Sequence, residues 1–127
     1  MNALFLLAAV LLGLLALAHA YWGETRIFPR LPAAGVDAET RLSLYIPWHQ
    51  LTYVLALGAV GLLLGALRPD LRVLPAFVLA IVAGNMALFF VLSALKGQRA
   101  LIGRSAPQIG LFAVLIALIA LGLATSG

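Results

Sequence analysis

Cysteine is missing from this 127-residue sequence, and charged residues are scarce. Without cysteine, the chain has no disulfide framework, thiolate metal site or thiol chemistry. Only 9% of its residues are charged and 65% are hydrophobic, whereas a soluble protein has about 25% charged and roughly 45–50% apolar residues. A soluble domain of this length could not bury so much apolar surface. The composition therefore predicts a single membrane domain over residues 1–127.

The few charges lie between long apolar runs. Eight basic and four acidic residues give a net charge of +4. The sequence has no basic patch of the kind that a folded nucleic-acid-binding face carries. In a membrane protein, an excess of lysine and arginine in the loops orients the helices. We therefore predict that the chain contacts the lipid bilayer and no nucleic acid.

Four apolar runs are long enough to cross a bilayer, which needs about 20 helical residues. They cover about residues 3–22, 48–67, 73–95 and 107–124. This pattern predicts an all-α fold, an integral membrane four-helix bundle. The first run has an alternative interpretation as a signal peptide, because Ala18-His19-Ala20 has the small-x-small pattern of a cleavage site. The length of the run and the lack of a basic residue before it favour a retained helix.

The first connection, residues 23–47, is the longest polar segment. Pro29, Pro32 and Gly35 predict an extended loop in its first half. Asp37 is a good helix cap, and the apolar residues that follow it have helical spacing. We predict a short helix over residues 38–46 that ends before Pro47 and lies in the headgroup region.

The distribution of basic residues predicts the orientation. The positive-inside rule places the first and third connections in the cytoplasm, so that four spans leave both termini outside it. These two connections contain Arg26, Arg30, Arg41, Lys96, Arg99 and Arg104, whereas the second connection contains Arg68 and Arg72.

Polar and aromatic residues gather at the predicted cytoplasmic boundary, and we expect the ends of the first, second and fourth helices to bring them together. We expect Glu24 to form an ion pair with Arg26 or Arg104. Trp48 is also a residue type typical of membrane interfaces. The predicted members of this polar cluster are His19, Glu24, Arg26, Trp48, His49, Thr52, Arg104 and Gln108.

Small residues one helical turn apart predict close helix packing. Gly58, Gly61 and Gly65 lie along the second span, where such spacing lets two helix backbones approach each other in lipid. We interpret them as a packing face inside the bundle rather than a dimer seam. Asn85 lies in the middle of the third span, and a buried amide in hydrocarbon needs a partner. We expect Asn85 to face the bundle interior and to join two helices by a hydrogen bond.

The two histidines allow one cofactor hypothesis. His19 and His49 are predicted at similar depth on neighbouring helices, and two neutral imidazoles can hold a haem b between helices. A His19, His49 and Glu24 metal site lacks a His-Glu-x-x-His spacing that would place its ligands on one helix. We predict no metal site and no cofactor, and we keep haem as the alternative.

Two short motifs carry a resemblance. His19-x-x-x-Gly23-Glu24-x-Arg26 follows the first span, and Trp48-His49-x-x-Thr52 opens the second. In a chain with four apolar runs, they resemble a family of uncharacterised small bacterial membrane proteins. The resemblance implies a multi-pass protein of the bacterial inner membrane, and it implies no reaction.

The packing faces and the polar residues of the chain suggest three possible functions. The helices offer packing faces and no complete catalytic set, which favours a non-enzymatic accessory or interaction subunit with a membrane-protein partner or a second copy of the chain. Haem binding by His19 and His49 is the first alternative. A small transporter or channel using Asn85 is the second, although the spans have no charged residue at mid-depth.

Overall fold

The computed structural model describes residues 1–125, and within them every regular element is helical. The all-α prediction is therefore confirmed. The elements in chain order are α1 (Ala3–Trp22), the π-helical turn η1 (Gly23–Ile27), the 3₁₀ turn η2 (Phe28–Arg30), α2 (Ala38–Leu67), the 3₁₀ turn η3 (Pro69–Leu71), α3 (Val73–Leu95), the short α4 (Arg99–Arg104) and α5 (Ala106–Ala124).

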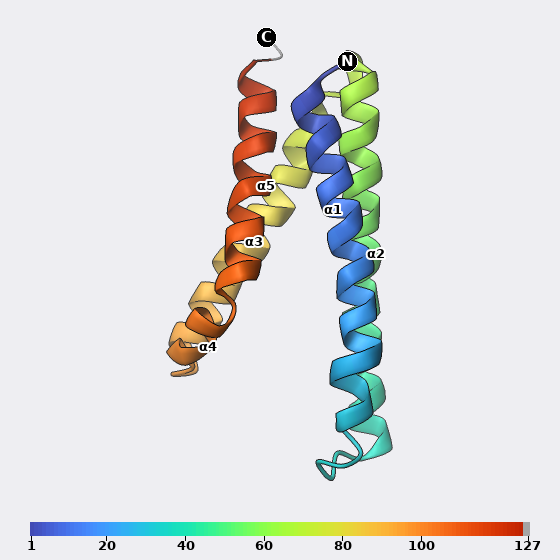
Figure 1. The fold of residues 1–127 in the computed structure, drawn as a ribbon, viewed down its shortest axis with the longest axis vertical. Helices are drawn as coiled ribbons and strands as arrows, with labels where there is room; N and C mark the ends of the chain where they lie inside the picture. Colours follow the sequence, from blue (N-terminus) through green and yellow to red (C-terminus); the bar gives the residue numbers. More distant parts are fainter. Residues whose placement is uncertain (126–127) are drawn as a thin grey trace.

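Four of these helices are long and apolar enough to cross a membrane. The chain is thus a multi-pass membrane protein in its coarse architecture, as the apolar runs predict. The bounds of α1 and α3 are those expected from hydropathy, and α5 begins one residue before the predicted span. Both termini lie at the same end of the molecule (Figure 1).

The prediction of a separate interfacial helix before Pro47 is wrong. Residues 38–46 form the first turns of α2, which continues through Pro47 as one helix of 30 residues. Proline removes only one backbone hydrogen bond from a helix, and long membrane helices tolerate that loss. The predicted cap is correct, because the Asp37 side chain accepts a hydrogen bond from the backbone N–H of Thr40 at 2.9 Å. At 1.5 Å per residue, α2 is about 45 Å long and extends beyond a hydrocarbon core of about 30 Å.

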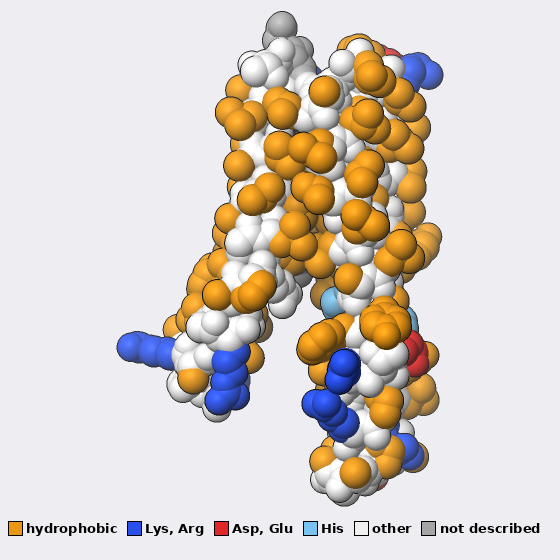
Figure 2. Space-filling view, viewed as in Figure 1, with side chains coloured by type: hydrophobic (Ala, Val, Ile, Leu, Met, Phe, Trp, Pro, Cys, Tyr) orange, Lys and Arg blue, Asp and Glu red, His pale blue; other side chains and the backbone are white. Residues whose placement is uncertain are grey.

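The helices form two pairs that meet at one end and separate at the other (Figure 1). α1 packs along α2, and α3 packs with α5. Contacts of α1 with α5 and of α2 with α3 join the two pairs. We call the end that holds both termini the closed end, and the two separated ends the α1/α2 tip and the α3/α5 tip. The side of the molecule is largely hydrophobic, while basic side chains gather at both tips (Figure 2).

The core lies toward the closed end. Phe5, Leu62, Leu115 and Ile119 are fully buried there. Asn2 ties three helices together, because its backbone N–H donates to the Ala66 carbonyl at 2.9 Å and its side-chain amide donates to the Gly122 carbonyl at 3.1 Å. Its side-chain oxygen also caps α1.

Glycines explain why the helix pairs approach at one end only. Between the pairs, a Cβ on Gly65 would overlap the ring of Pro75, and a Cβ on Gly122 would overlap the ring of Phe5; within the first pair, a Cβ on Gly58 would lie 3.0 Å from Leu12. A Cβ on Gly61 would make ordinary van der Waals contacts with Val78 and Leu74 of α3. The predicted glycine face therefore packs within this chain. Glycines in the separated half, in contrast, have open space around them: Gly84, Gly103 and Gly110.

Candidate functional site: a braced helix pair beside a membrane-facing cleft

The end of α1 widens into a π-helical turn at Gly23–Ile27. Such turns are rare and often occur at functional sites. Gly23 is buried here, and a Cβ at this position would lie 2.9 Å from both Trp48 Cδ1 and Phe28 Cε2 and still closer to Trp48 Nε1. The absence of a side chain therefore lets the Trp48 indole lie directly against the α1 backbone.

His19, Trp48 and Thr52 join α1 to α2. The Trp48 indole N–H donates to the His19 carbonyl at 3.0 Å, and the two rings stack with centroids 4.1 Å apart and an interplanar angle of 12°. The Thr52 hydroxyl donates to the Trp48 carbonyl at 3.2 Å and lies 2.8 Å from His19 Nδ1. A hydroxyl has one proton, so with that proton directed to Trp48, a neutral His19 donates from Nδ1 and keeps its lone pair on Nε2.

Glu24 contacts α2 through one carboxylate oxygen. The Tyr45 hydroxyl donates to Oε1 at 2.6 Å, and His49 Nε2 lies 2.9 Å from the same oxygen. The His49 contact is close but is not aligned as a hydrogen bond, which leaves this buried nitrogen without one. The expected ion pair of Glu24 with an arginine is replaced by these contacts.

Aromatic rings close the cluster on its outer side. The Phe28 ring centroid lies 4.7 Å from that of Tyr45, 5.8 Å from that of Trp48 and 6.0 Å from that of His49. Sequence reasoning missed both Phe28 and Tyr45. Tyr45, Trp48, His49 and Thr52 have the spacing of one helix face, so continuing the helix through Pro47 would have found Tyr45. Phe28 is placed by η1 and η2, and no sequence pattern points to it.

The structure divides the predicted polar cluster between the two helix pairs. His19, Glu24, Trp48, His49 and Thr52 come together as expected. Arg26 is exposed, with its guanidinium carbon 6.0 Å from the centroid of the Trp22 ring. Arg104 is exposed at the end of α4, and Gln108 lies on α5. The two pairs diverge (Figure 1), so that Gln108 lines the same cleft as His19 from the opposite pair, whereas Arg104 is not one of the cleft residues.

A cleft of about 350 Å³ lies between the two pairs. Most of its wall is apolar, and His19 is the residue that links it to the cluster on α1 and α2. Asn85 faces this cleft, but its side-chain amide donates to the Ile81 carbonyl of its own helix at 2.9 Å. The expected interhelical bond is thus replaced by an intrahelical one. The lining residues are Leu15, His19, Leu51, Leu55, Asn85, Met86, Leu88, Phe89, Leu92, Ser105, Gln108, Ile109 and Phe112.

The two histidines have different surroundings. His19 lines the cleft and contacts Thr52, whereas His49 lies against Glu24 and Tyr45 and is not one of the cleft residues. A haem held by both imidazoles needs them to face each other across one space. In residues 1–125, no three His, Cys, Asp or Glu side chains lie close enough together to hold a metal ion. This geometry does not favour either cofactor arrangement.

Comparison of the chain with models of known protein families, with curated proteins and with solved structures gives no match.

Proposed function

We propose that this protein is a non-enzymatic accessory subunit of the bacterial inner membrane that acts by binding, with the cleft between its helix pairs as the binding site. The cleft is the observation that carries this proposal. A concave, mostly apolar space with a few polar groups is the usual form of a ligand site. Here the polar groups are one imidazole, two amides and one hydroxyl: His19, Asn85, Gln108 and Ser105.

The cluster on α1 and α2 supports a binding role because it stiffens one wall of the cleft. His19 is held by its neighbours on α2 through a ring stack and two hydrogen bonds. These contacts orient the imidazole and cost a ligand no further ordering of the side chain. A preorganised wall is what binding requires.

The polar groups of the cleft do not make a catalytic set. An imidazole acts as a strong general base when a carboxylate orients it and a nucleophile lies within hydrogen-bond reach. His19 contacts a threonine hydroxyl instead of a carboxylate, and that hydroxyl is directed to a backbone carbonyl. The carboxylate of Glu24 contacts Tyr45 and His49, which lie outside the cleft.

The proposal includes the orientation of the four helices across the membrane. Both tips carry the basic loops, so the positive-inside rule places them in the cytoplasm and the termini outside it. Because the chain has no cysteine, single cysteines introduced at Lys96 and at Arg72 can be labelled in intact cells with a membrane-impermeant maleimide. We expect labelling at position 72 and protection at position 96 until the cells are opened. The reverse pattern would contradict the orientation.

Photo-crosslinking tests the cleft as the binding site. Benzoylphenylalanine replaces Phe89, which lines the cleft, or Phe77, which is exposed on the same helix outside it. After irradiation of native membranes, we expect a defined product at position 89 that position 77 does not give. Identical products from both positions would show that the cleft has no occupant of its own and would refute the proposed function.

A further inference from the structure

The size of the cleft limits what it can hold. Its volume of about 350 Å³ is within the range of small-molecule sites, roughly 300–1,000 Å³. The cleft is therefore large enough for a small molecule or for part of a lipid acyl chain.

On α1 and α5 the lining of the cleft is polar toward the tips and apolar above them, whereas on α3 the polar Asn85 lies deeper than the apolar Leu92. His19 is in the last turn of α1, and Ser105 and Gln108 are at the start of α5. One turn further toward the closed end, the wall is formed by Leu15 and Phe112. A molecule with a polar group near the tips and an apolar tail directed toward the closed end matches this order.

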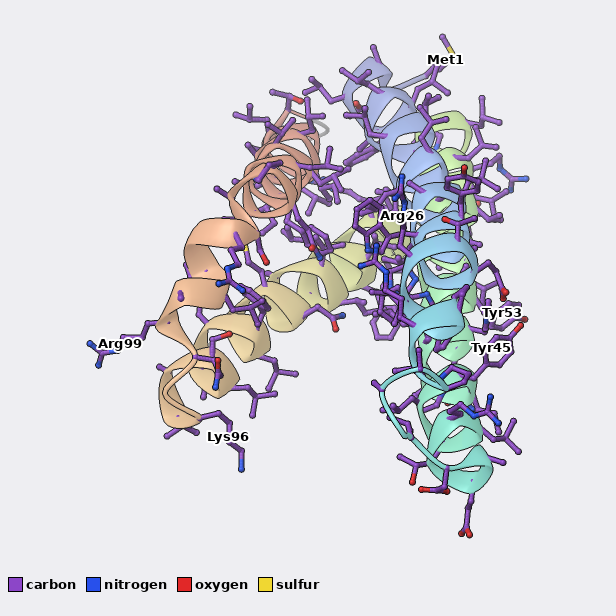
Figure 3. All side chains as sticks on the ribbon, turned by 60° about the horizontal axis from the view of Figure 1, so that its bottom comes forward. Met1, Arg26, Tyr45, Tyr53, Lys96 and Arg99 are labelled. Atoms are coloured by element: carbon purple, nitrogen blue, oxygen red, sulfur yellow. The ribbon has the colours of Figure 1, made fainter. Side chains whose placement is uncertain are left out.

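The charge at the α3/α5 tip has one sign. Lys96, Arg99 and Arg104 lie there, while the last acidic residue of the whole sequence is Asp70. All three cations are exposed, and within residues 1–125 no carboxylate forms an ion pair with them. Figure 3 shows Lys96 and Arg99 extending outward from this tip.

In the sequence, these cations are close to residues that line the cleft. Lys96 follows the lining residue Leu92 by one helical turn, and Arg104 directly precedes the lining residue Ser105. Basic side chains also lie on the α1/α2 tip, including on the side that faces the other pair (Figure 2). Positive charge thus flanks the open end of an apolar cleft at membrane-interface depth.

We propose that the cleft binds an anionic phospholipid, with an acyl chain between the helix pairs and the phosphate headgroup at the α3/α5 tip. Basic pockets between helices on the cytoplasmic side are typical sites for anionic headgroups. The polar lining groups Ser105 and Gln108 then face the ester region of the lipid, where they can donate hydrogen bonds, while His19 Nε2 offers a hydrogen-bond acceptor. This inference rests on the proposed binding function and names its ligand class.

Native mass spectrometry of the full chain in detergent tests the inference. Phosphatidylglycerol and phosphatidylcholine with identical acyl chains are added in parallel, and we expect one phosphatidylglycerol to be retained preferentially. Each basic residue near an anionic group contributes about fivefold to binding. The double variant R99Q/R104Q should therefore weaken phosphatidylglycerol binding by about 5- to 30-fold. The matched variant R68Q/R72Q, which removes the same charge at the closed end, should leave it unchanged.

The outcomes separate this inference from the proposed function. Equal retention of both lipids, or equal losses in the two double variants, would overturn the anionic-lipid site. If the Phe89 crosslink captures a protein or another small molecule instead of a lipid, the binding function stands and the lipid inference fails. If the Phe89 crosslink gives no product of its own, both fail.

Discussion

Gly23→Ala is the sharpest test of the contact between α1 and α2. The new methyl group would overlap the Trp48 indole and lie 2.9 Å from Phe28 Cε2. The indole cannot rotate away without losing its hydrogen bond to the His19 carbonyl and its stack on the His19 ring. The overlap is therefore relieved only by moving the two helices apart or by breaking these contacts.

The expected cost follows from three terms. Overpacking costs about 1–3 kcal/mol, and loss of the indole hydrogen bond costs about 1 kcal/mol. The higher helix propensity of alanine stabilises the helix by up to about 1 kcal/mol and offsets part of this loss. We therefore expect Gly23→Ala to lower the free energy of unfolding by about 1–3 kcal/mol.

Unfolding of the purified protein in mixed detergent and dodecyl sulfate, followed by circular dichroism, measures this change. Gly110→Ala is the matched control, because Gly110 lies in a helix with no atom within 4 Å of the added methyl group. We expect this control to be neutral or up to about 1 kcal/mol more stable. Equal unfolding midpoints for the two variants would refute the contact between Gly23 and Trp48.

Three further predictions test other contacts by the same unfolding assay or by nuclear magnetic resonance. Thr52→Val should cost about 1–3 kcal/mol because it leaves the histidine nitrogen unpaired, whereas Thr52→Ser should keep most of the stability; equal losses would exclude the hydroxyl bridge. Gly65→Ala should cost about 1–3 kcal/mol by overlapping the proline ring of α3, while Gly61→Ala should be tolerated; the reverse order would contradict the packing. Hydrogen bonds from the backbone and hydroxyl of Thr40 hold the pKa of Asp37 below its ordinary value, so its stabilisation of the helix start is complete above about pH 4 and is lost as the pH falls through the lowered pKa. The amide resonance of Thr40 should shift in this acid range, and it should not do so in Asp37→Asn.

The positions of the spans could be predicted from the sequence because insertion into lipid depends on local hydropathy. An apolar run of about 20 residues must hydrogen-bond its own backbone in hydrocarbon and so becomes a helix whatever its neighbours are. The bounds of α1 and α3 follow from this rule alone. The cap at Asp37 was predictable for a similar reason, since its partner Thr40 is three residues away.

Part of the candidate site was also visible in the sequence. Two short motifs single out His19, Glu24, Trp48, His49 and Thr52, and the structure brings these five together. His19 and Glu24 lie at the end of α1, and the other three lie on the part of α2 that packs beside it, so the short connection between these helices keeps all five near each other. Tyr45 was missed because a helix break was expected at Pro47.

Only the tertiary structure decided where the helix pairs meet and where they part. Phe28 joins the cluster through a π-helical turn, while Gln108 shares only the cleft lining with His19 because α3 and α5 diverge from α1 and α2. Gly65 and Gly122 allow the two pairs to approach closely near the closed end, whereas Gly84 and Gly110 lie where the pairs have already separated. Local sequence determines which segments become helices, but the separation of two helices depends on side chains far apart in the chain.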